Sequence, residues 1–259
     1  MSASPTALRV IAAEAARAAG MLLRERFVAG GEQATGSKSS PTDLVSEADL
    51  AAERAIRALL AARRPGDAVL GEEGGETQAG KGLRWIVDPL DGTVNFLFGV
   101  PQWCVSVAVH DDQGALAGVV FDPLRDELFA AERGGPATLD GAPVSGSQRS
   151  QLESALVATG FAYESSVRCT QAAVVARVLP AVRDIRRMGS AALDLAWTAA
   201  GRCDAYYERG VQPWDIAAGS LLCERAGLVV RPLPAEGAAP QGLVVAPPGL
   251  IDELQALVS

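Results

Sequence analysis

The sequence predicts an α/β protein with an antiparallel sheet in its first part and a mainly parallel sheet in its second part. Two long amphipathic stretches open the chain, and short apolar segments joined by tight turns follow them. From about residue 150, strand-like and helix-like segments alternate, which is typical of a partly parallel sheet. We therefore divide the 259 residues into parts 1–150 and 151–259 and expect one continuous unit.

The first part contains two predicted helices and five predicted strands. Apolar residues recur at helical spacing over 6–28, and a polar, glycine-rich loop covers 30–43. Ser46 and Asp49 have the spacing of a capping box, so we place the start of a second helix there, running to about residue 64. The predicted strands are 67–73, 84–88, 103–110, 115–122 and 127–134, the last three forming an antiparallel meander.

The second part alternates between the two kinds of segment. The predicted strands are 154–161, 184–189, 203–210, 227–233 and 242–248, and the predicted helices are 167–182, 190–201, 213–227 and 250–258.

Composition excludes several classes of function. The net charge is −8 with no basic stripe, so we expect no nucleic-acid partner. No apolar run reaches the roughly 18 residues of a membrane span, and the first twenty residues lack the apolar centre of a signal peptide. The four cysteines are widely spaced, which favours reduced thiols and a cytoplasmic protein. The single histidine, His110, lies in an apolar strand-like stretch, so any catalysis must depend on carboxylates.

Two carboxylates stand three residues apart in WIVDPLDGTVNF, residues 85–96. Pro89 favours an extended Asp88 and a turn, which holds Asp88 and Asp91 on one side of a tight loop. The carbonyl of Leu90 would lie between them, and three oxygen donors in so small a space suit Mg²⁺.

The residues that follow predict an anion site beside this cation site. Gly92 and Thr93 precede a short helical turn, and free backbone N–H groups at such a start bind phosphate. A cation site beside an anion site is the requirement of metal-assisted phosphate chemistry. Taken alone, however, the same residues also fit a surface turn with Thr93 as a helix cap.

Other acids also lie at the ends of predicted elements, where α/β folds build their sites. Glu72 ends a strand, and Asp215 lies just inside a helix after Pro213. Each has a simpler explanation: a solvated loop charge for Glu72, an acid favoured by the helix dipole for Asp215, and a cap for Asp49.

Three separated motifs resemble the inositol monophosphatase family of Mg²⁺-dependent, lithium-sensitive sugar phosphatases. They are GEE at 71–73, WIVDPLDGTVNF at 85–96 and WDIAAG at 214–219. Supporting matches are SSPTDLVSEAD at 39–49 and MGSAALDLAWTAAGRCDAYYERG at 188–210. The resemblance spans most of the chain and implies a layered αβαβα fold, a homodimer and two or three Mg²⁺ per site.

The resemblance also implies a role for individual residues. The implied metal ligands are Glu72, Asp88, the Leu90 carbonyl, Asp91 and Asp215, and the implied catalytic residues are Asp49, Thr93 and Glu72. Gly92 and Thr93 would bind phosphate, and Lys38 would be an accessory residue. The implied substrate contacts are Asp91, Gly189, Ser190, Ala191, Glu208 and Asp215. The expected reaction is in-line attack of water on a phosphate monoester without a phosphoenzyme.

Several alternatives stay open from the sequence. Within the family, inositol 1-phosphate is the expected substrate, but Glu208 could equally hold the ammonium group of histidinol phosphate; a 3′-phosphonucleotide or fructose bisphosphate is less expected. Arg186, Arg187 and Arg209 are candidates for substrate or dimer contacts, with solvated surface charge as the default. A haloacid-dehalogenase-type phosphatase is disfavoured because its D-x-D spacing is absent here. A metal-binding module without catalysis is disfavoured because the acid set is complete.

Overall fold

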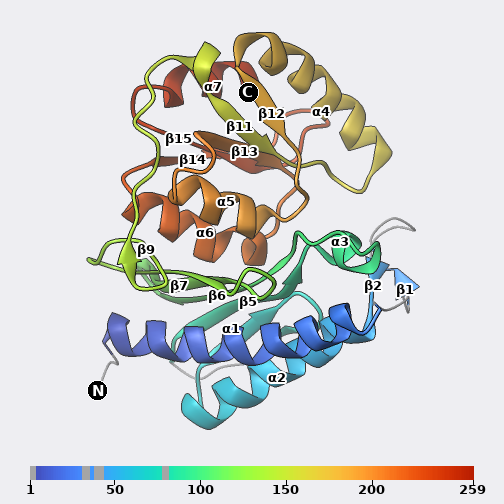
Figure 1. The fold of residues 1–259 in the computed structure, drawn as a ribbon, viewed down its shortest axis with the longest axis vertical. Helices are drawn as coiled ribbons and strands as arrows, with labels where there is room; N and C mark the ends of the chain where they lie inside the picture. The colour runs from blue at the N-terminus through green and yellow to red at the C-terminus, as the bar shows by residue number, and fades with distance from the viewer. Residues whose placement is uncertain (1–3, 31–35, 38–43, 78–81) are drawn as a thin grey trace.

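The computed structural model describes residues 4–30, 36–37, 44–77 and 82–259. Five layers are stacked in it: helices, an eight-stranded sheet, helices, a five-stranded sheet and helices (Figure 1). This arrangement confirms the predicted fold class. Lys38 and most of the predicted loop 30–43 lie outside the described residues.

Helices α1 (Pro5–Val28) and α2 (Glu47–Arg63) form the outer layer on the N-terminal sheet (Figure 1). Small buried residues along one face of α1, such as Ala12, Ala15 and Ala19, let it lie close to the sheet. The capping box at the start of α2 is present as predicted, because Ser46 and Asp49 each accept a hydrogen bond from the first turn. A two-stranded ribbon, β1 (Gly36–Ser37) and β2 (Leu44–Val45), precedes α2.

The N-terminal sheet has the strand order β10-β9-β8-β7-β6-β5-β3-β4. Its strands are β3 (Ala68–Gly71), β4 (Gly75–Glu76), β5 (Arg84–Asp91), β6 (Cys104–Asp111), β7 (Gly114–Asp122), β8 (Glu127–Glu132), β9 (Thr138–Leu139) and β10 (Ala142–Pro143). The meander from β6 to β8 is antiparallel, as predicted, and β5 also pairs antiparallel with β6. The pair β3 and β5 is parallel, however, because the chain first reverses into β4, which pairs antiparallel on the other side of β3, before it enters β5.

The C-terminal sheet has the order β12-β11-β13-β15-β14. Its strands are β11 (Leu156–Thr159), β12 (Asp184–Arg186), β13 (Ala205–Arg209), β14 (Val229–Leu233) and β15 (Gly242–Ala246). Strand β11 is parallel to both β12 and β13, whereas β15 is antiparallel to both of its neighbours. The sheet is therefore half parallel rather than mainly parallel, because β14 and β15 are consecutive strands joined without a crossover helix.

Four helices complete the layers around the C-terminal sheet. They are α4 (Ser165–Val178), α5 (Ala191–Ala199), α6 (Pro213–Arg225) and α7 (Ile251–Val258). Helices α4 and α7 cover the outer face, and α5 and α6 lie between the two sheets (Figure 1). The predicted helix over 167–182 ends earlier, in a 3₁₀ turn at Leu179–Ala181 that contains Pro180.

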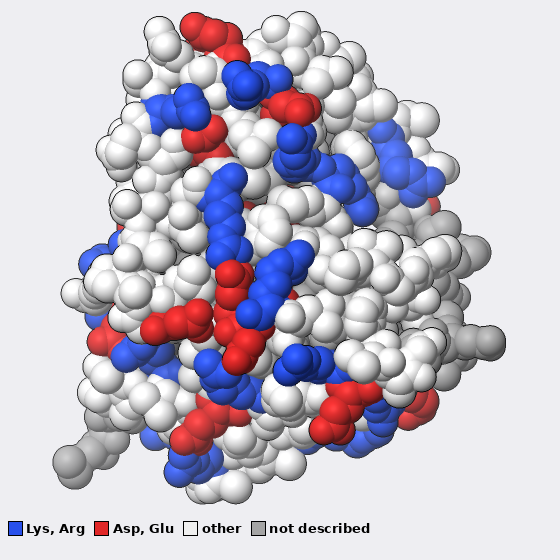
Figure 2. All heavy atoms as spheres, in the orientation of Figure 1, with Lys and Arg blue, Asp and Glu red and all other residues white. Residues whose placement is uncertain are grey.

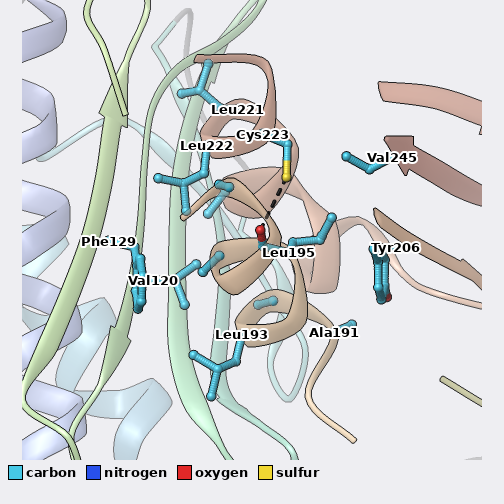
Figure 3. Packing of buried hydrophobic residues seen from close by; sticks show 14 of the residues in the cluster. Val120, Phe129, Ala191, Leu193, Leu195, Tyr206, Leu221, Leu222, Cys223 and Val245 are labelled. Carbon is cyan, nitrogen blue, oxygen red and sulfur yellow. Dashed lines mark hydrogen bonds between the residues drawn. The ribbon is translucent and has the colours of Figure 1, made fainter. Parts of the chain in front are cut away.

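The shared core lies in the central helical layer. Leu193 and Leu222 face Val120 and Phe129 of the N-terminal sheet, while Tyr206 and Val245 lie on the other side of the helices (Figure 3). Gly219 of α6 packs so closely on α5 that an added Cβ would lie 2.5 Å from the Leu195 Cβ. One continuous apolar cluster therefore joins both parts of the chain, and the division near residue 150 stays a prediction.

Candidate active site

The carboxyl end of β5 presents the two aspartates of the 85–96 motif. The Asp88 carboxylate accepts a hydrogen bond from the Leu90 N–H at 3.0 Å, which closes the turn around Pro89. The pairing of β5 with β6 shifts register between Asp88 and Asp91, because Pro89 has no N–H to donate to the sheet. Asp88 and Asp91 are both buried, at 1% and 9% exposure. The strand therefore delivers two carboxylates to one enclosed place.

Gly92 directs the chain from β5 into the short helix α3 (Thr93–Leu97). Its φ of +100° lies in the left-handed region, and an added Cβ would meet the Gln102 carbonyl oxygen at 3.0 Å, so only glycine fits without strain. Phe96 anchors α3 in the core, because the centre of its ring lies 5.5 Å from that of Phe27 and 5.1 Å from that of Trp103. The amides predicted to bind phosphate therefore belong to a well-supported turn.

Asp49 and Thr93, predicted as a pair, are brought into direct contact. The Thr93 hydroxyl lies 2.8 Å from an Asp49 carboxylate oxygen and 3.1 Å from the Leu90 carbonyl oxygen. The other Asp49 oxygen accepts hydrogen bonds from the Ser46 N–H and hydroxyl. Asp49 is thus both the capping acid of α2 and the partner of Thr93, so the two interpretations of this residue are compatible.

Asp91 is held by the start of α5, which comes from the second part of the chain. One of its carboxylate oxygens accepts hydrogen bonds from the Ser190 hydroxyl and the Ala192 N–H, both at 2.7 Å. Ser190 is buried, and its hydroxyl is turned to Asp91 and away from the cavity. Ser190 was predicted to contact the substrate, but its side chain is occupied by Asp91, so only its backbone is left for such a contact.

Asp215 is held by the start of α6. One of its carboxylate oxygens accepts the Gln212 N–H at 2.7 Å, which is the capping-box contact of this helix. Ser106 of β6 donates to the carbonyl of the preceding residue, Trp214. The helix start is thereby fixed to the N-terminal sheet, beside the end of β5.

Glu72 lies in the turn after β3, and two residues that the sequence analysis missed support that turn. The buried Glu53 carboxylate accepts the N–H groups of Glu73 and Gly74 at 2.8 and 2.9 Å. It also pairs with Arg57 at 2.7 Å, and Arg57 donates to the Gly75 carbonyl. The available signal was the spacing of Glu53 and Arg57, four and eight residues after Asp49 on one helix.

The acids repel one another strongly. Burial raises the pKa of Asp88 well above its usual range, and repulsion from Glu72, Asp91 and Asp215 raises it further. Burial likewise raises the pKa of Asp215, and it raises the pKa of Asp91 to about 6 although Ser190 and Ala192 donate hydrogen bonds to it. Ionisation of all four carboxyl groups is unfavourable because they are close together and desolvated. A bound cation would stabilise their ionised forms.

The described part of the chain contains no three acidic, histidine or cysteine side chains that already form a metal-coordinating set. Asp91 and Asp215 instead each direct one oxygen to a backbone N–H. The donor chemistry nevertheless fits Mg²⁺, since every group is a hard oxygen donor and the mutual repulsion would be relieved. The metal-ligand assignment stays a prediction.

A cavity of about 570 Å³ opens from the acids toward the C-terminal sheet. Its lining includes Glu72, Leu90, Asp91, Gly92, Thr93, Phe161, Arg187, Gly189, Ala191, Glu208 and Asp215. A second cavity, of about 910 Å³, lies along the opposite face of α6 and has none of the predicted site residues in its lining. We take the smaller cavity as the candidate site because most of the predicted site residues line it.

Glu208 forms the far wall of the smaller cavity. It accepts a hydrogen bond from the Tyr206 hydroxyl at 2.7 Å, and burial raises its pKa to about 7 despite that contact. A Cβ on Gly160, the residue after β11, would lie 2.0 Å from a Glu208 oxygen, so glycine at this position leaves room for the Glu208 carboxylate. Arg209 is not a surface charge, because its guanidinium is buried and donates to the carbonyls of Pro234 and Pro240.

Asn95 is a further residue that the sequence analysis did not single out. Its side-chain amide donates to the carbonyls of Gln102 at 2.7 Å and Met188 at 2.8 Å. It therefore joins the loop after α3 to the segment that leads into α5.

Comparison with known proteins agrees with this geometry. The sequence profile of the inositol monophosphatase family matches residues 4–257. The inositol-1-monophosphatase SuhB of Mycobacterium tuberculosis is 42% identical over 270 residues, which cover 97% of this chain and 93% of that protein. The Nus factor SuhB of Escherichia coli is 40% identical over 222 residues, covering 85% of this chain and 83% of that protein.

Solved structures give the same answer. The extragenic suppressor protein SuhB of Bartonella henselae superimposes with a TM-score of 0.88 at 35% identity, covering 98% of both chains. The profile match and these relatives agree with the three motifs and with the layered fold. The chain therefore belongs to the inositol monophosphatase family and is a phosphatase.

Proposed function

We propose that this phosphatase is a Mg²⁺-dependent phosphomonoesterase that hydrolyses inositol 1-phosphate to inositol and phosphate. The observation that carries the proposal is the cluster of Glu72, Asp88, Asp91 and Asp215, whose mutual repulsion a cation would relieve. Three of these acids, Glu72, Asp91 and Asp215, line the cavity. The nearby contact of Asp49 with Thr93 supplies a proton acceptor for the attacking water.

The ionised acids carry a formal charge of −4, which would repel a phosphate monoester. Glu72, Asp88, the Leu90 carbonyl, Asp91 and Asp215 would hold two or three Mg²⁺. Bound Mg²⁺ supplies the positive charge that attracts the substrate and stabilises the negative charge of the transition state.

The remaining groups orient the reactants. Because the Thr93 hydroxyl donates to Asp49, its oxygen is left to accept a hydrogen bond from water and to draw off its proton. The Gly92 and Thr93 amides would hold the phosphate oxygens, and Glu208 would accept hydrogen bonds from the hydroxyls of the leaving alcohol. Lys38 is retained as an accessory residue on the resemblance alone.

Histidinol phosphate is the alternative substrate, with Glu208 holding an ammonium group; 3′-phosphonucleotides and fructose bisphosphate come after it. One relative is named a Nus factor, but the complete set of acids in this chain favours catalysis. We propose no nucleic-acid partner, since the net charge is −8.

A homodimer is proposed on the exposed apolar loop beside α3. Phe98 and Val100 are 75% and 43% exposed, and the surface on the side of α3 is mostly white in Figure 2, whereas blue and red side chains interleave elsewhere on this face.

Inhibition by lithium rests on the family resemblance. A cytoplasmic location rests on the four cysteines, which form no disulfide. Within the described residues, no helix has both the length and the hydropathy of a membrane span.

The first experiment measures phosphate release from inositol 1-phosphate with Mg²⁺ and with chelator, beside histidinol phosphate. We expect activity on inositol 1-phosphate that chelation abolishes. In Asp91→Asn, kcat should fall at least about 1,000-fold, because one oxygen donor and one charge are lost. Asp126→Asn is the matched control at an exposed acid. Near-normal turnover in Asp91→Asn would overturn the assignment, and a phosphorylated Asp88 would indicate the dehalogenase-type mechanism.

A further inference from the structure

Arg187 reaches the side of the active-site cavity on which Glu208 lies. Arg187 follows directly after β12, and its side chain lines the cavity together with Glu208 and Gly189. The parallel strands β11, β12 and β13 end side by side, so Phe161, Arg187 and Glu208 approach the cavity from neighbouring strand ends.

Two contacts fix where the guanidinium lies. Its central carbon is 5.9 Å from the centre of the Phe161 ring, which also lines the cavity. Its terminal nitrogen lies over Gly189, where an added Cβ would be only 2.6 Å away. Gly189 therefore leaves the space in which the arginine folds back over the cavity wall.

The charge of Arg187 is directed at the site and not neutralised by a surface acid. In the described segments, no carboxylate forms an ion pair with Arg187, whereas the adjacent Arg186 pairs with Asp184 at 2.6 Å. Arg187 lowers the pKa of both Glu208 and the buried Asp194, against the larger effect of burial. Its donors thus face the same space as the Glu208 carboxylate.

We propose that Arg187 is a specificity-determining residue that, with Glu208, selects neutral polyol phosphates and rejects phosphates of amino alcohols. The proposal rests on the phosphatase activity proposed above and names what its alcohol pocket accepts. A hydroxyl group both donates and accepts, so adjacent hydroxyls of a polyol can donate to Glu208 and accept from Arg187. An ammonium group only donates, and its charge is repelled by the guanidinium.

The test compares kcat/KM for inositol 1-phosphate and histidinol phosphate in the Mg²⁺-loaded protein and in Arg187→Met. Methionine keeps an apolar chain over Phe161 while it removes the charge and the donors. We expect the ratio of kcat/KM for histidinol phosphate to that for inositol 1-phosphate to rise about tenfold, as for two like charges separated by a few ångströms in a partly exposed site. Arg183→Met, an exposed arginine whose side chain is not in the cavity lining, should leave the ratio within twofold.

A second readout separates this inference from the proposed activity. Binding of the free alcohols, inositol and histidinol, is measured by calorimetry on the same variants, and Arg187→Met should shift the preference toward histidinol. An equal fall for both substrates, an unchanged ratio, or no binding of either alcohol would overturn the proposal. Inactive wild-type protein that still shows the binding shift would refute the substrate assignment alone and leave the role of Arg187 supported.

Discussion

Replacing Glu53 by glutamine tests whether the turn that carries Glu72 is held from behind. One Glu53 oxygen accepts the Glu73 N–H, and the other accepts the Gly74 N–H and pairs with Arg57. The glutamine oxygen can keep one of these positions, but its NH₂ group must face an N–H donor at the other. A buried N–H left without an acceptor costs about 1–3 kcal/mol, and the lost charge weakens the remaining contacts, so we expect about 2–4 kcal/mol in total.

The assay measures both thermal stability and activation by Mg²⁺. A loss of this size lowers Tm by roughly 5–15 °C in a chain of this length. Because the turn positions a predicted metal ligand, the Mg²⁺ concentration for half-maximal activity should rise about tenfold. Glu47→Gln, on the same helix but 58% exposed and 3.7 Å from Arg54, should change neither by more than a small amount. An unchanged Mg²⁺ requirement in a destabilised Glu53→Gln protein would refute the positioning role.

Three further predictions concern buried polar groups. Without metal, Asp91→Asn should be more stable than the wild type at pH 8 by about 3 kcal/mol, because the folded pKa of Asp91 is about 6 against a usual 3.8. In urea unfolding, this difference in stability should vanish toward pH 4, and at pH 8 it should reverse when Mg²⁺ is added. Burial also raises the pKa of Asp194, whose carboxylate oxygens accept no hydrogen bond within the described structure, so Asp194→Asn should raise Tm at pH 8 more than at pH 5; an equal change at both would contradict this. Asn95→Ala leaves two carbonyls without their donor and should cost about 2–4 kcal/mol in urea unfolding, and a loss below about 0.5 kcal/mol would show that the link to Met188 is dispensable.

The parts of the site that the sequence predicted are those set by local chemistry. The Pro89 turn, the Ser46 and Asp49 capping box, and the acid in the first turn of α6 all follow from residues within four positions of one another. Such short-range contacts leave a clear pattern in the sequence. Asp49 could be predicted as a cap from spacing alone, whereas its contact with Thr93, 44 residues away, came only through the family resemblance.

The parts that the sequence did not predict depend on long-range pairing. The parallel pairing of β3 with β5 depends on the path through β4, and nothing in a four-residue strand specifies its neighbour. Arg209 and Arg187 lie 22 positions apart and are both basic, yet the Arg209 guanidinium is buried against carbonyls, whereas the Arg187 guanidinium lies over Phe161 and Gly189. Only the strand order, which places the ends of β12 and β13 on either side of β11, separates these roles.

The central helical layer couples the site to the core. Helices α5 and α6 both begin at the acids: the Ala192 N–H binds Asp91, and Asp215 caps its own helix. Each helix start carries a partial positive charge of about half an elementary charge, which offsets only a part of the repulsion among the carboxylates and leaves the remainder to cations. The same two helices are in close contact where Gly219 meets Leu195. A change of spacing there would move the support of Asp91 relative to Asp215, so a purely apolar contact in the core sets the separation of two predicted metal ligands.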